Sequence, residues 1–252
     1  MTIASRKLAD ALIEARRAGR LARLTPDLVP VDIAAAMRTQ KVVAEAIGGS
    51  IGGWKVGYTP DAIPVAAPIY AHLMHRSGAT LGQGPSRRSG IEVEIALLLG
   101  RDLPPRPGRA YGRTDILDAA QALLAGIEIV EPRFPESSKP PFLAILAANI
   151  NNGGYVRGEE VRDFRGLDLS HLRASLVIDG RKVHEGVGGH AKLDPLIPVL
   201  DYANTPCDLL GGLRAGHIVT TGTLSGCPYV EGAAKVVAEI EGLGEVEVEI
   251  KP

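Results

Sequence analysis

The chain has 252 residues, 45% hydrophobic and 23% charged, which is enough apolar material for one large globular domain, with or without a small accessory segment. Its formal net charge is -1 and its aromatic content is 4%, so neither a nucleic-acid partner nor an anionic membrane is indicated. The spacing of Cys207 and Cys227, the only cysteines, fits neither a disulfide framework nor a zinc site.

The first residues are charged, and no apolar run approaches the roughly 20 residues that cross a bilayer. We therefore expect a cytoplasmic protein with no signal peptide and no membrane span.

Two helices are predicted within the first 48 residues. Leu8, Leu12 and Ala15 recur at helical spacing, and Thr25-Pro26 interrupts the pattern. A second apolar stripe follows, with Gly48-Gly49 as its expected C-terminal cap, and consists of Ile33, Met37, Ala44 and Ile47.

Beyond these helices the pattern changes to short strand-like runs. They cover residues 54–58, 91–99, 127–130, 172–178, 217–221, 235–240 and 245–250. Asp179-Gly180 predicts a tight hairpin turn, and a second hairpin is expected at residues 242–244. Residues 103–112 and 133–141 are expected to be loops.

Two further helices are predicted between the strands. Thr114 is the expected N-cap of one that carries Ile116, Ala120 and Leu123 and stops at Gly126, and Asp194-Pro195 is the expected start of the other. Because helices and strands do not alternate regularly and hairpins cluster near the C-terminus, we predict an α+β fold with a mixed or antiparallel sheet.

The most informative segment is the strand over residues 91–99. Strand alternation places its odd-numbered apolar residues on one face and Glu92 and Glu94 on the other, about 7 Å apart at the backbone. Burying two carboxylates together is costly unless a cation or a proton compensates them, and oxygen-only ligands select Mg²⁺ or Mn²⁺. Alternatively, this face is solvated and the two glutamates are ordinary surface charges.

A third carboxylate lies on the next apolar strand. Glu128 and Glu131 are three residues apart, so on a regular strand they point to opposite faces and only one of them can join Glu92 and Glu94. The spacing does not decide which.

Three other features are candidates for a site. Lys55, in a short strand rimmed by glycines, could meet an anion or could be an edge-strand charge. The turn at residues 220–226 could bind a carboxylate or be a plain turn. His184, Glu185 and His190 do not have the spacing of a helical zinc motif, so their glycine-rich segment is interpreted as a hairpin loop. No nucleophile elbow, Walker motif or dinucleotide-binding glycine pattern is present.

Five segments, taken in order, resemble one family. They are Gly-Trp-Lys-Val-Gly at 53–57, Ile-Glu-Val-Glu-Ile-Ala-Leu-Leu-Leu at 91–99, Gly-Ile-Glu-Ile-Val at 126–130, Asn-Asn-Gly-Gly-Tyr-Val at 151–156 and Ile-Val-Thr-Thr-Gly-Thr at 218–223. The chain resembles the 2-keto-4-pentenoate hydratase branch of the fumarylacetoacetate hydrolase superfamily along nearly its whole length.

The resemblance implies a fold, a cofactor and a site. The fold would be a mixed β-roll, with an N-terminal helical segment and first strand in residues 1–75 and the metal-binding roll in residues 76–252. Mg²⁺ or Mn²⁺ would be held by Glu92, Glu94 and Glu128, which leaves Glu131 aside. Lys55 would be catalytic, and the substrate would be bound by Gly222, Thr223 and Asn151.

Two departures from the family pattern bear on the reaction. Where relatives carry an aspartate in a Pro-Asp-x-Gly stretch, residues 63–70 contain no acid, and Ala148-Asn149 stands where Asp-Asn is common. The first departure removes an acid or base that hydration would use.

Three functions are therefore considered. The first is a hydratase (a lyase) that adds water to a 2-hydroxy-2,4-dienoate in aromatic catabolism. The second is a 4-oxalocrotonate-type decarboxylase or a β-diketo acid C–C hydrolase of the same superfamily. The third is a non-catalytic keto-acid-binding relative. The resemblance further implies a homo-oligomer that could form a complex with another enzyme of its pathway.

Overall fold

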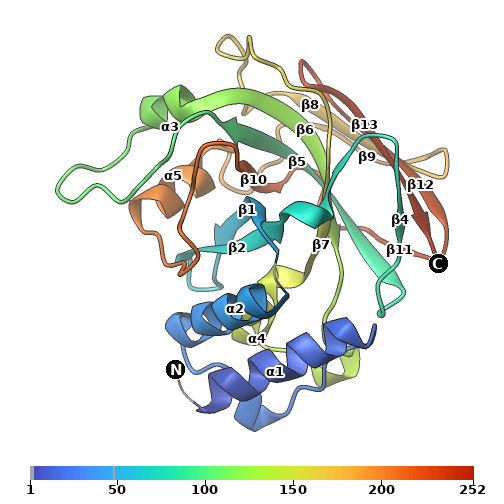
Figure 1. The fold of residues 1–252 in the computed structure, drawn as a ribbon. Coiled ribbons are helices and arrows are strands. Elements are labelled where there is room, and N and C mark those ends of the chain that lie inside the picture. The colour runs from blue at the N-terminus through green and yellow to red at the C-terminus, as the bar shows by residue number, and fades with distance from the viewer. Residues whose placement is uncertain (1–2, 48) are drawn as a thin grey trace.

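The computed structural model describes residues 3–47 and 49–252. The two N-terminal helices are present as α1 (Ile3–Arg17) and α2 (Ile33–Ile47), separated by a short 3-10 turn at Pro26–Leu28. The expected cap at Gly48 lies outside the described residues. Together with α4 (Phe142–Ala147), these helices enclose a hydrophobic cluster that includes Leu8, Leu12 and Met37, and they gather at the lower end of the molecule in Figure 1.

Two mixed sheets are formed by the described part of the chain. The strands of the larger sheet run in the order β2-β1-β10-β5-β6-β7-β3, with β11 paired to β5. They are β1 (Ile51–Tyr58), β2 (Pro64–Tyr70), β3 (Met74–Arg76), β5 (Arg88–Leu99), β6 (Ala120–Val130), β7 (Asn152–Arg157), β10 (Ile218–Thr223) and β11 (Tyr229–Glu231).

The second sheet has the order β4-β13-β12-β8-β9. Its strands are β4 (Ala79–Gly82), β8 (Arg173–Ile178), β9 (Arg181–Val187), β12 (Ala234–Ile240) and β13 (Gly244–Lys251). In both sheets most neighbouring strands are antiparallel, but β1–β10, β3–β7 and β4–β13 are parallel pairs. The predicted α+β class with a mixed sheet is therefore confirmed.

The main core lies between the two sheets. The odd-numbered apolar residues of β5, from Ile91 to Leu99, are fully buried there and pack with residues of β8, β12 and β13 such as Leu176 and Val248. The opposite face of β5, which carries the two glutamates, turns away from this core. Figure 1 shows β5 and β6 as long, curved strands beside the second sheet.

Both predicted hairpin turns are present, but the helix predicted from Thr114 is shorter than expected and starts elsewhere. Asp179 and Gly180 both have positive φ (51° and 76°) and connect β8 to β9, as a tight hairpin turn requires. The turn at residues 242–244 connects β12 to β13. Thr114, however, is not an N-cap: α3 (Arg113–Ala119) begins after Gly112 and ends at Ala119, since the following residues pair with β5 as strand β6.

The last predicted helix also starts later than expected. It is α5 (Ile197–Asn204), and Asp194 instead accepts a hydrogen bond from the Leu196 amide in the preceding turn. Strands β1 and β2, from the expected N-terminal segment, share a sheet with β5 and β10, and the division at residue 75 stays a prediction. No helix among the described residues is long and apolar enough to cross a membrane.

Candidate metal centre and active site

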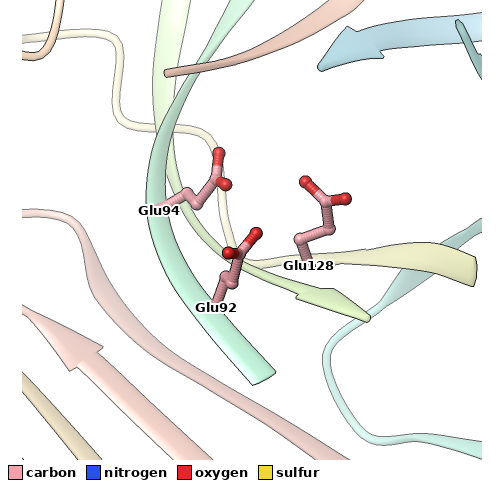
Figure 2. A group of neighbouring side chains, drawn as sticks. All are labelled: Glu92, Glu94 and Glu128. Atoms are coloured by element: carbon pink, nitrogen blue, oxygen red, sulfur yellow. The ribbon is translucent and has the colours of Figure 1, made fainter. Parts of the chain in front are cut away.

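Three carboxylates converge on the curved face formed by β5 and β6. In the antiparallel β5–β6 ladder, Glu92 lies directly opposite Glu128, and Glu94 lies opposite Gly126. One oxygen from each of Glu92, Glu94 and Glu128 lies within 4.8 Å of the others, and Figure 2 shows the three side chains pointing toward one another. Register, which a single strand does not reveal, brings the third acid to the first two.

The triad is buried enough to need a compensating charge. Glu94 and Glu128 are 1% and 0% exposed, and one oxygen of Glu128 has no hydrogen-bond partner in the described chain. Unpaired buried carboxylates are strongly unfavourable, and an all-oxygen set of this size matches hard divalent cations. The residues present therefore fit an Mg²⁺ or Mn²⁺ ion, and the alternative of a solvated glutamate face does not hold.

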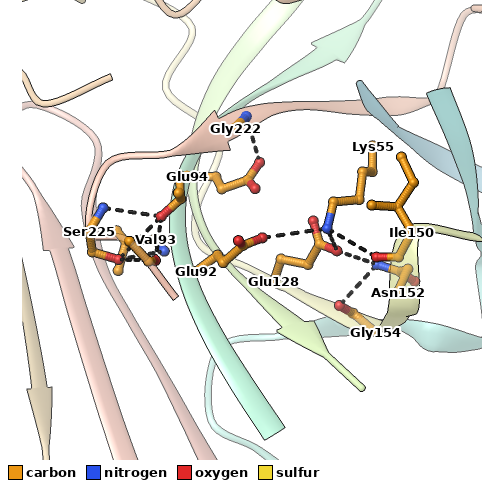
Figure 3. Close-up of polar contacts among 12 residues, drawn as sticks. Lys55, Glu92, Val93, Glu94, Glu128, Ile150, Asn152, Gly154, Gly222 and Ser225 are labelled. Atoms are coloured by element: carbon orange, nitrogen blue, oxygen red, sulfur yellow. Dashed lines mark hydrogen bonds and ion pairs between the residues drawn. The ribbon is translucent and has the colours of Figure 1, made fainter. Parts of the chain in front are cut away.

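Lys55 places a positive charge next to the triad. Its Nζ lies 2.7 Å from an oxygen of Glu128 and 3.4 Å from an oxygen of Glu92, and it donates to the carbonyl of Ile150 at 3.5 Å. Figure 3 shows the ammonium group at the centre of these contacts. Lys55 is thus a largely covered cation beside the triad and not an edge-strand charge, since β1 lies between β2 and β10.

The mutual influence of these groups appears in their pKa values. Burial, followed by the charges of Glu128 and Glu92, raises the pKa of Glu94 to about 8. Burial also raises the pKa of Glu128, although the ammonium of Lys55 opposes that effect. Burial alone would lower the pKa of Lys55, but the three carboxylates outweigh it and raise that pKa well above its usual value.

Glu131 belongs to a different cluster. Its carboxylate lies 3.3 Å from Arg133 and accepts a hydrogen bond from the amide of Gly84 at 2.8 Å. The choice between Glu128 and Glu131 that the spacing left open is therefore decided by geometry: Glu128 faces Glu92, and Glu131 does not join them.

The C-terminal end of β10 contacts the triad through its backbone. The amide of Gly222 donates to Glu94 at 3.0 Å, and Gly222 has a φ of 106°, which favours glycine. The hydroxyl of Thr223 donates to the carbonyl of Gly226 and so stabilises the turn that follows. His190 packs against Gly222. Its Nδ1 accepts from the Lys192 amide, so its Nε2 carries the proton and donates to the carbonyl of Thr221.

Asn151 and Asn152 have different environments. The side chain of Asn151 accepts a hydrogen bond from the amide of Arg133 at 3.3 Å. The side chain of Asn152 instead donates to Glu128 at 3.1 Å and is 2% exposed. Sequence reasoning selected the first asparagine of the pair and missed the second, which the start of β7 directs toward the carboxylates.

Tyr155 is another neighbour that the sequence did not single out. Its ring lies over Gly126, where a side chain would overlap the hydroxyl, and this hydroxyl is fully buried with no hydrogen-bond partner among the described residues. Burial, followed by the charges of Glu94 and Glu128, raises its pKa well above the usual value. Gly126 in the Gly-Ile-Glu segment was the one sequence feature that could have indicated a large neighbouring side chain, because a glycine makes room for one.

Two further positions bear on the chemistry. Ala67 on β2 is the register partner of Lys55, so a small apolar residue of the acid-free segment 63–70 stands beside the lysine. Burial, followed by the charge of Glu92, raises the pKa of Cys227 to about 12. Such a shift disfavours the thiolate form at this position.

Comparison with known proteins identifies the family of the chain. Residues 60–251 match the family model described as the C-terminal region of fumarylacetoacetate (FAA) hydrolase. The chain belongs to the fumarylacetoacetate hydrolase family. It is 28% identical over 251 residues to a 2-keto-4-pentenoate hydratase of Burkholderia vietnamiensis, covering 95% of this chain and 94% of that one.

The chain is also similar to 4-oxalocrotonate decarboxylases. A 4-oxalocrotonate decarboxylase of Pseudomonas putida is 26% identical over 80% of this chain and 78% of its own. The structure of 4-oxalocrotonate decarboxylase from Pseudomonas putida G7, complexed with magnesium and adipate, superposes with a TM-score of 0.83 at 20% identity, covering 98% of this chain and 97% of that one. The predicted β-roll of the fumarylacetoacetate hydrolase family, preceded by N-terminal helices, is thereby confirmed.

Proposed function

We propose that the protein is a divalent-metal-dependent hydratase that converts a 2-hydroxy-2,4-dienoate of the 2-keto-4-pentenoate type into a 4-hydroxy-2-keto acid. The observation that carries the proposal is the buried triad of Glu92, Glu94 and Glu128 with Lys55 beside it. Relatives named 2-keto-4-pentenoate hydratase that match over most of the chain support the same reaction and its place in aromatic catabolism.

The cofactor belongs to the proposal. Glu92, Glu94 and Glu128 would hold one Mg²⁺ or Mn²⁺ ion, consistent with the hard oxygen ligands that they offer. When bound, the ion supplies Lewis-acid polarisation of the keto acid's oxygens. Asn152 and the Gly222 amide fix the orientation of Glu128 and Glu94, and Tyr155 excludes water from one side of the site.

The chain's own residues account for proton movement and substrate placement. Tautomerisation takes the proton from the enol oxygen at C2 and delivers one to C5. Water then adds its hydroxyl to C4 and a proton to C3. Lys55 is the group that we assign to the tautomerisation, because it is held at the triad as an ammonium: it would deliver its proton to C5 and regain one from the enol oxygen. Gly222 and Thr223 would receive the substrate carboxylate at the end of β10, and Asn151 would also contribute to substrate binding.

Decarboxylation of a 4-oxalocrotonate-type substrate is the second candidate. The observation that favours it is Ala67 opposite Lys55. Adding water requires a group that deprotonates the water, whereas loss of CO₂ needs only stabilisation of the resulting enolate. A C–C hydrolase also needs an activated water, so this observation does not favour it.

The experiment that tests the proposal follows the loss of dienol absorbance of 2-hydroxypenta-2,4-dienoate with purified protein and Mg²⁺. Turnover to a 4-hydroxy-2-keto acid, identified by NMR, is expected for the wild type and for Lys41→Met, an exposed control, and not for Lys55→Met. Release of CO₂ from 2-oxohex-3-enedioate without hydration would identify the decarboxylase instead. Tight pyruvate or oxalate binding without turnover of any keto acid would identify a binding protein.

Three wider features of the proposal rest on the resemblance to the family. They are a homo-oligomeric state, association with a partner enzyme of the same pathway, and a cytoplasmic location. Sedimentation of the purified protein alone and mixed with a candidate pathway enzyme measures the first two.

A further inference from the structure

A second charged pocket lies apart from the carboxylate triad. It has a volume of about 370 Å³ and lies between α1 and the end of β6, where its charged groups are Arg16, Arg20, Glu131 and Arg133. None of the three triad glutamates lines it. The hydratase proposal assigns this pocket no role, and the pocket does not depend on that proposal.

One positive charge in this pocket is not matched by an ion pair within the described chain, although the carboxylate of Glu131 acts on Arg16 from beyond ion-pair distance. Arg133 is paired with Glu131 and donates to the carbonyl of Asn152 at 2.8 Å. Arg20, at the rim, is paired with Glu14. Arg16 makes no hydrogen bond or ion pair with any described residue. Its one recorded contact of this kind is with the ring of Tyr70, whose centroid lies 5.9 Å from the guanidinium carbon.

Arg16 and Arg133 also have unused hydrogen-bond donors. The Nε atoms of both Arg16 and Arg133 are buried without a hydrogen-bond partner. Burial lowers the pKa of Arg16, and burial together with the charge of Arg16 lowers the pKa of Arg133 to about 10. Two neighbouring cations removed from water raise the free energy of the empty pocket, and an anion between them would lower it.

We propose that this pocket binds the carboxylate group of a small organic acid, held by the guanidinium groups of Arg16 and Arg133. The charge balance selects the ligand: after the pairs with Glu131 and Glu14 are formed, a single positive charge is left, which one carboxylate neutralises. The planar guanidinium fork matches a carboxylate with two parallel hydrogen bonds. A phosphate dianion would bring one negative charge too many.

The pocket is connected to the metal centre through one residue. Arg133 holds the backbone carbonyl of Asn152, and the side chain of Asn152 donates to Glu128. A ligand that draws Arg133 toward itself therefore acts on the residue that orients a carboxylate of the triad. The expected consequence is that occupancy of the pocket changes the affinity of the triad for its cation.

The test measures binding of propionate and of inorganic phosphate by calorimetry. The full-length protein is stripped of metal and exchanged into a buffer free of carboxylates and phosphate, so that chelation at the triad does not contribute. Arg16→Gln removes the uncompensated charge. Arg17→Gln is the matched control, because this neighbouring arginine is exposed and its one hydrogen bond to the described residues is with the carbonyl of Ala46.

The wild type and Arg17→Gln are expected to bind one propionate per chain, and Arg16→Gln to bind it at least about tenfold more weakly, the effect of losing one charge-assisted hydrogen bond. Equal affinity in all three proteins, or no propionate binding by the wild type, would overturn the proposal, as would binding of phosphate alone.

Arg16→Lys serves as a second variant should Arg16→Gln not fold. It keeps the charge and loses the fork, so propionate affinity is expected to fall by about threefold or more. Unchanged affinity in Arg16→Lys would contradict a role of the guanidinium in binding.

Discussion

Glu92 and Glu128 face each other as register partners across the β5–β6 ladder, and the ammonium of Lys55 contacts both. Like charges at directly opposed positions destabilise a sheet unless something neutralises them. Lys55 therefore has a structural role within the chain in addition to the proposed chemical one.

Replacing Lys55 by methionine should destabilise the metal-free protein. Glu128 is fully buried, so it would lose its partner at 2.7 Å. The free energy of unfolding in urea is expected to fall by about 3 kcal/mol, a value typical of breaking a buried ion pair, and excess Mg²⁺ should restore most of it.

The control for this change is Lys41→Met. Lys41 forms only an exposed pair with Glu45 on α2, so its loss should change the free energy of unfolding by no more than about 0.5 kcal/mol. An equal loss in both variants, or no recovery with Mg²⁺ in Lys55→Met, would refute the assigned role of Lys55.

The raised pKa of Glu94 should make the stability of the metal-free protein depend on pH. Its pKa is raised from 4.5 to about 8 by burial and by its carboxylate neighbours. A raised pKa means that the folded state holds the proton more tightly, so this stabilisation is complete below pH 4.5 and is lost as the pH rises through about 8.

Calorimetric melting of the metal-free protein from pH 5 to 8 should therefore show a falling Tm from this group, with a smaller decline in Glu94→Gln. Excess Mg²⁺ should also reduce the decline, because it binds the ionised carboxylate. The assignment fails if the wild type and Glu94→Gln show the same slope.

Gly126 is required by the ring of Tyr155. A Cβ at this position would overlap the Tyr155 hydroxyl beside Glu94, so Gly126→Ala must displace the ring. We expect a loss of about 1–3 kcal/mol in the free energy of unfolding and weaker Mn²⁺ binding. Gly57→Ala is the control, since Gly57 is also in a strand but has open space around its Cα. Comparable losses in the two variants would show that the ring does not set this requirement.

Asn152 should influence the cation through Glu128. Asn152→Ala removes the hydrogen bond to this carboxylate, and partners of metal ligands commonly contribute about 10- to 100-fold in metal affinity. Asn151→Gly, which preserves the positive φ of 57° at that position, should alter Mn²⁺ affinity much less. If titration of both variants shows the larger effect at Asn151, the interpretation of the two asparagines is reversed.

Much of the fold could be predicted from the sequence because alternation and turn chemistry are local. The two faces of β5 and the turn at Asp179-Gly180 are examples. The predicted start of β6 was wrong because Ala120 and Leu123 also fit a helical stripe. Pairing with β5 makes this segment a strand. The buried strand β2 was missed, since two prolines interrupt its pattern.

The site could be predicted from the sequence only in part, because strand pairing brings its residues together. Alternation placed Glu92 and Glu94 together, but the partner of Glu92 depends on strand register, which is a long-range property. The resemblance to the family selected Glu128, and geometry agrees. Nothing local distinguished Asn152 from Asn151, or indicated that Tyr155 would lie over Gly126.

Calorimetric titration with Mn²⁺ tests the central claim that Glu92, Glu94 and Glu128 form a divalent-cation site. It compares the wild type with Glu94→Gln and with Glu131→Gln, which changes a nearby buried acid paired with Arg133. One Mn²⁺ per chain is expected for the wild type and for Glu131→Gln, and loss of binding is expected in Glu94→Gln. Equal losses in both variants, or undiminished binding in Glu94→Gln, would contradict it.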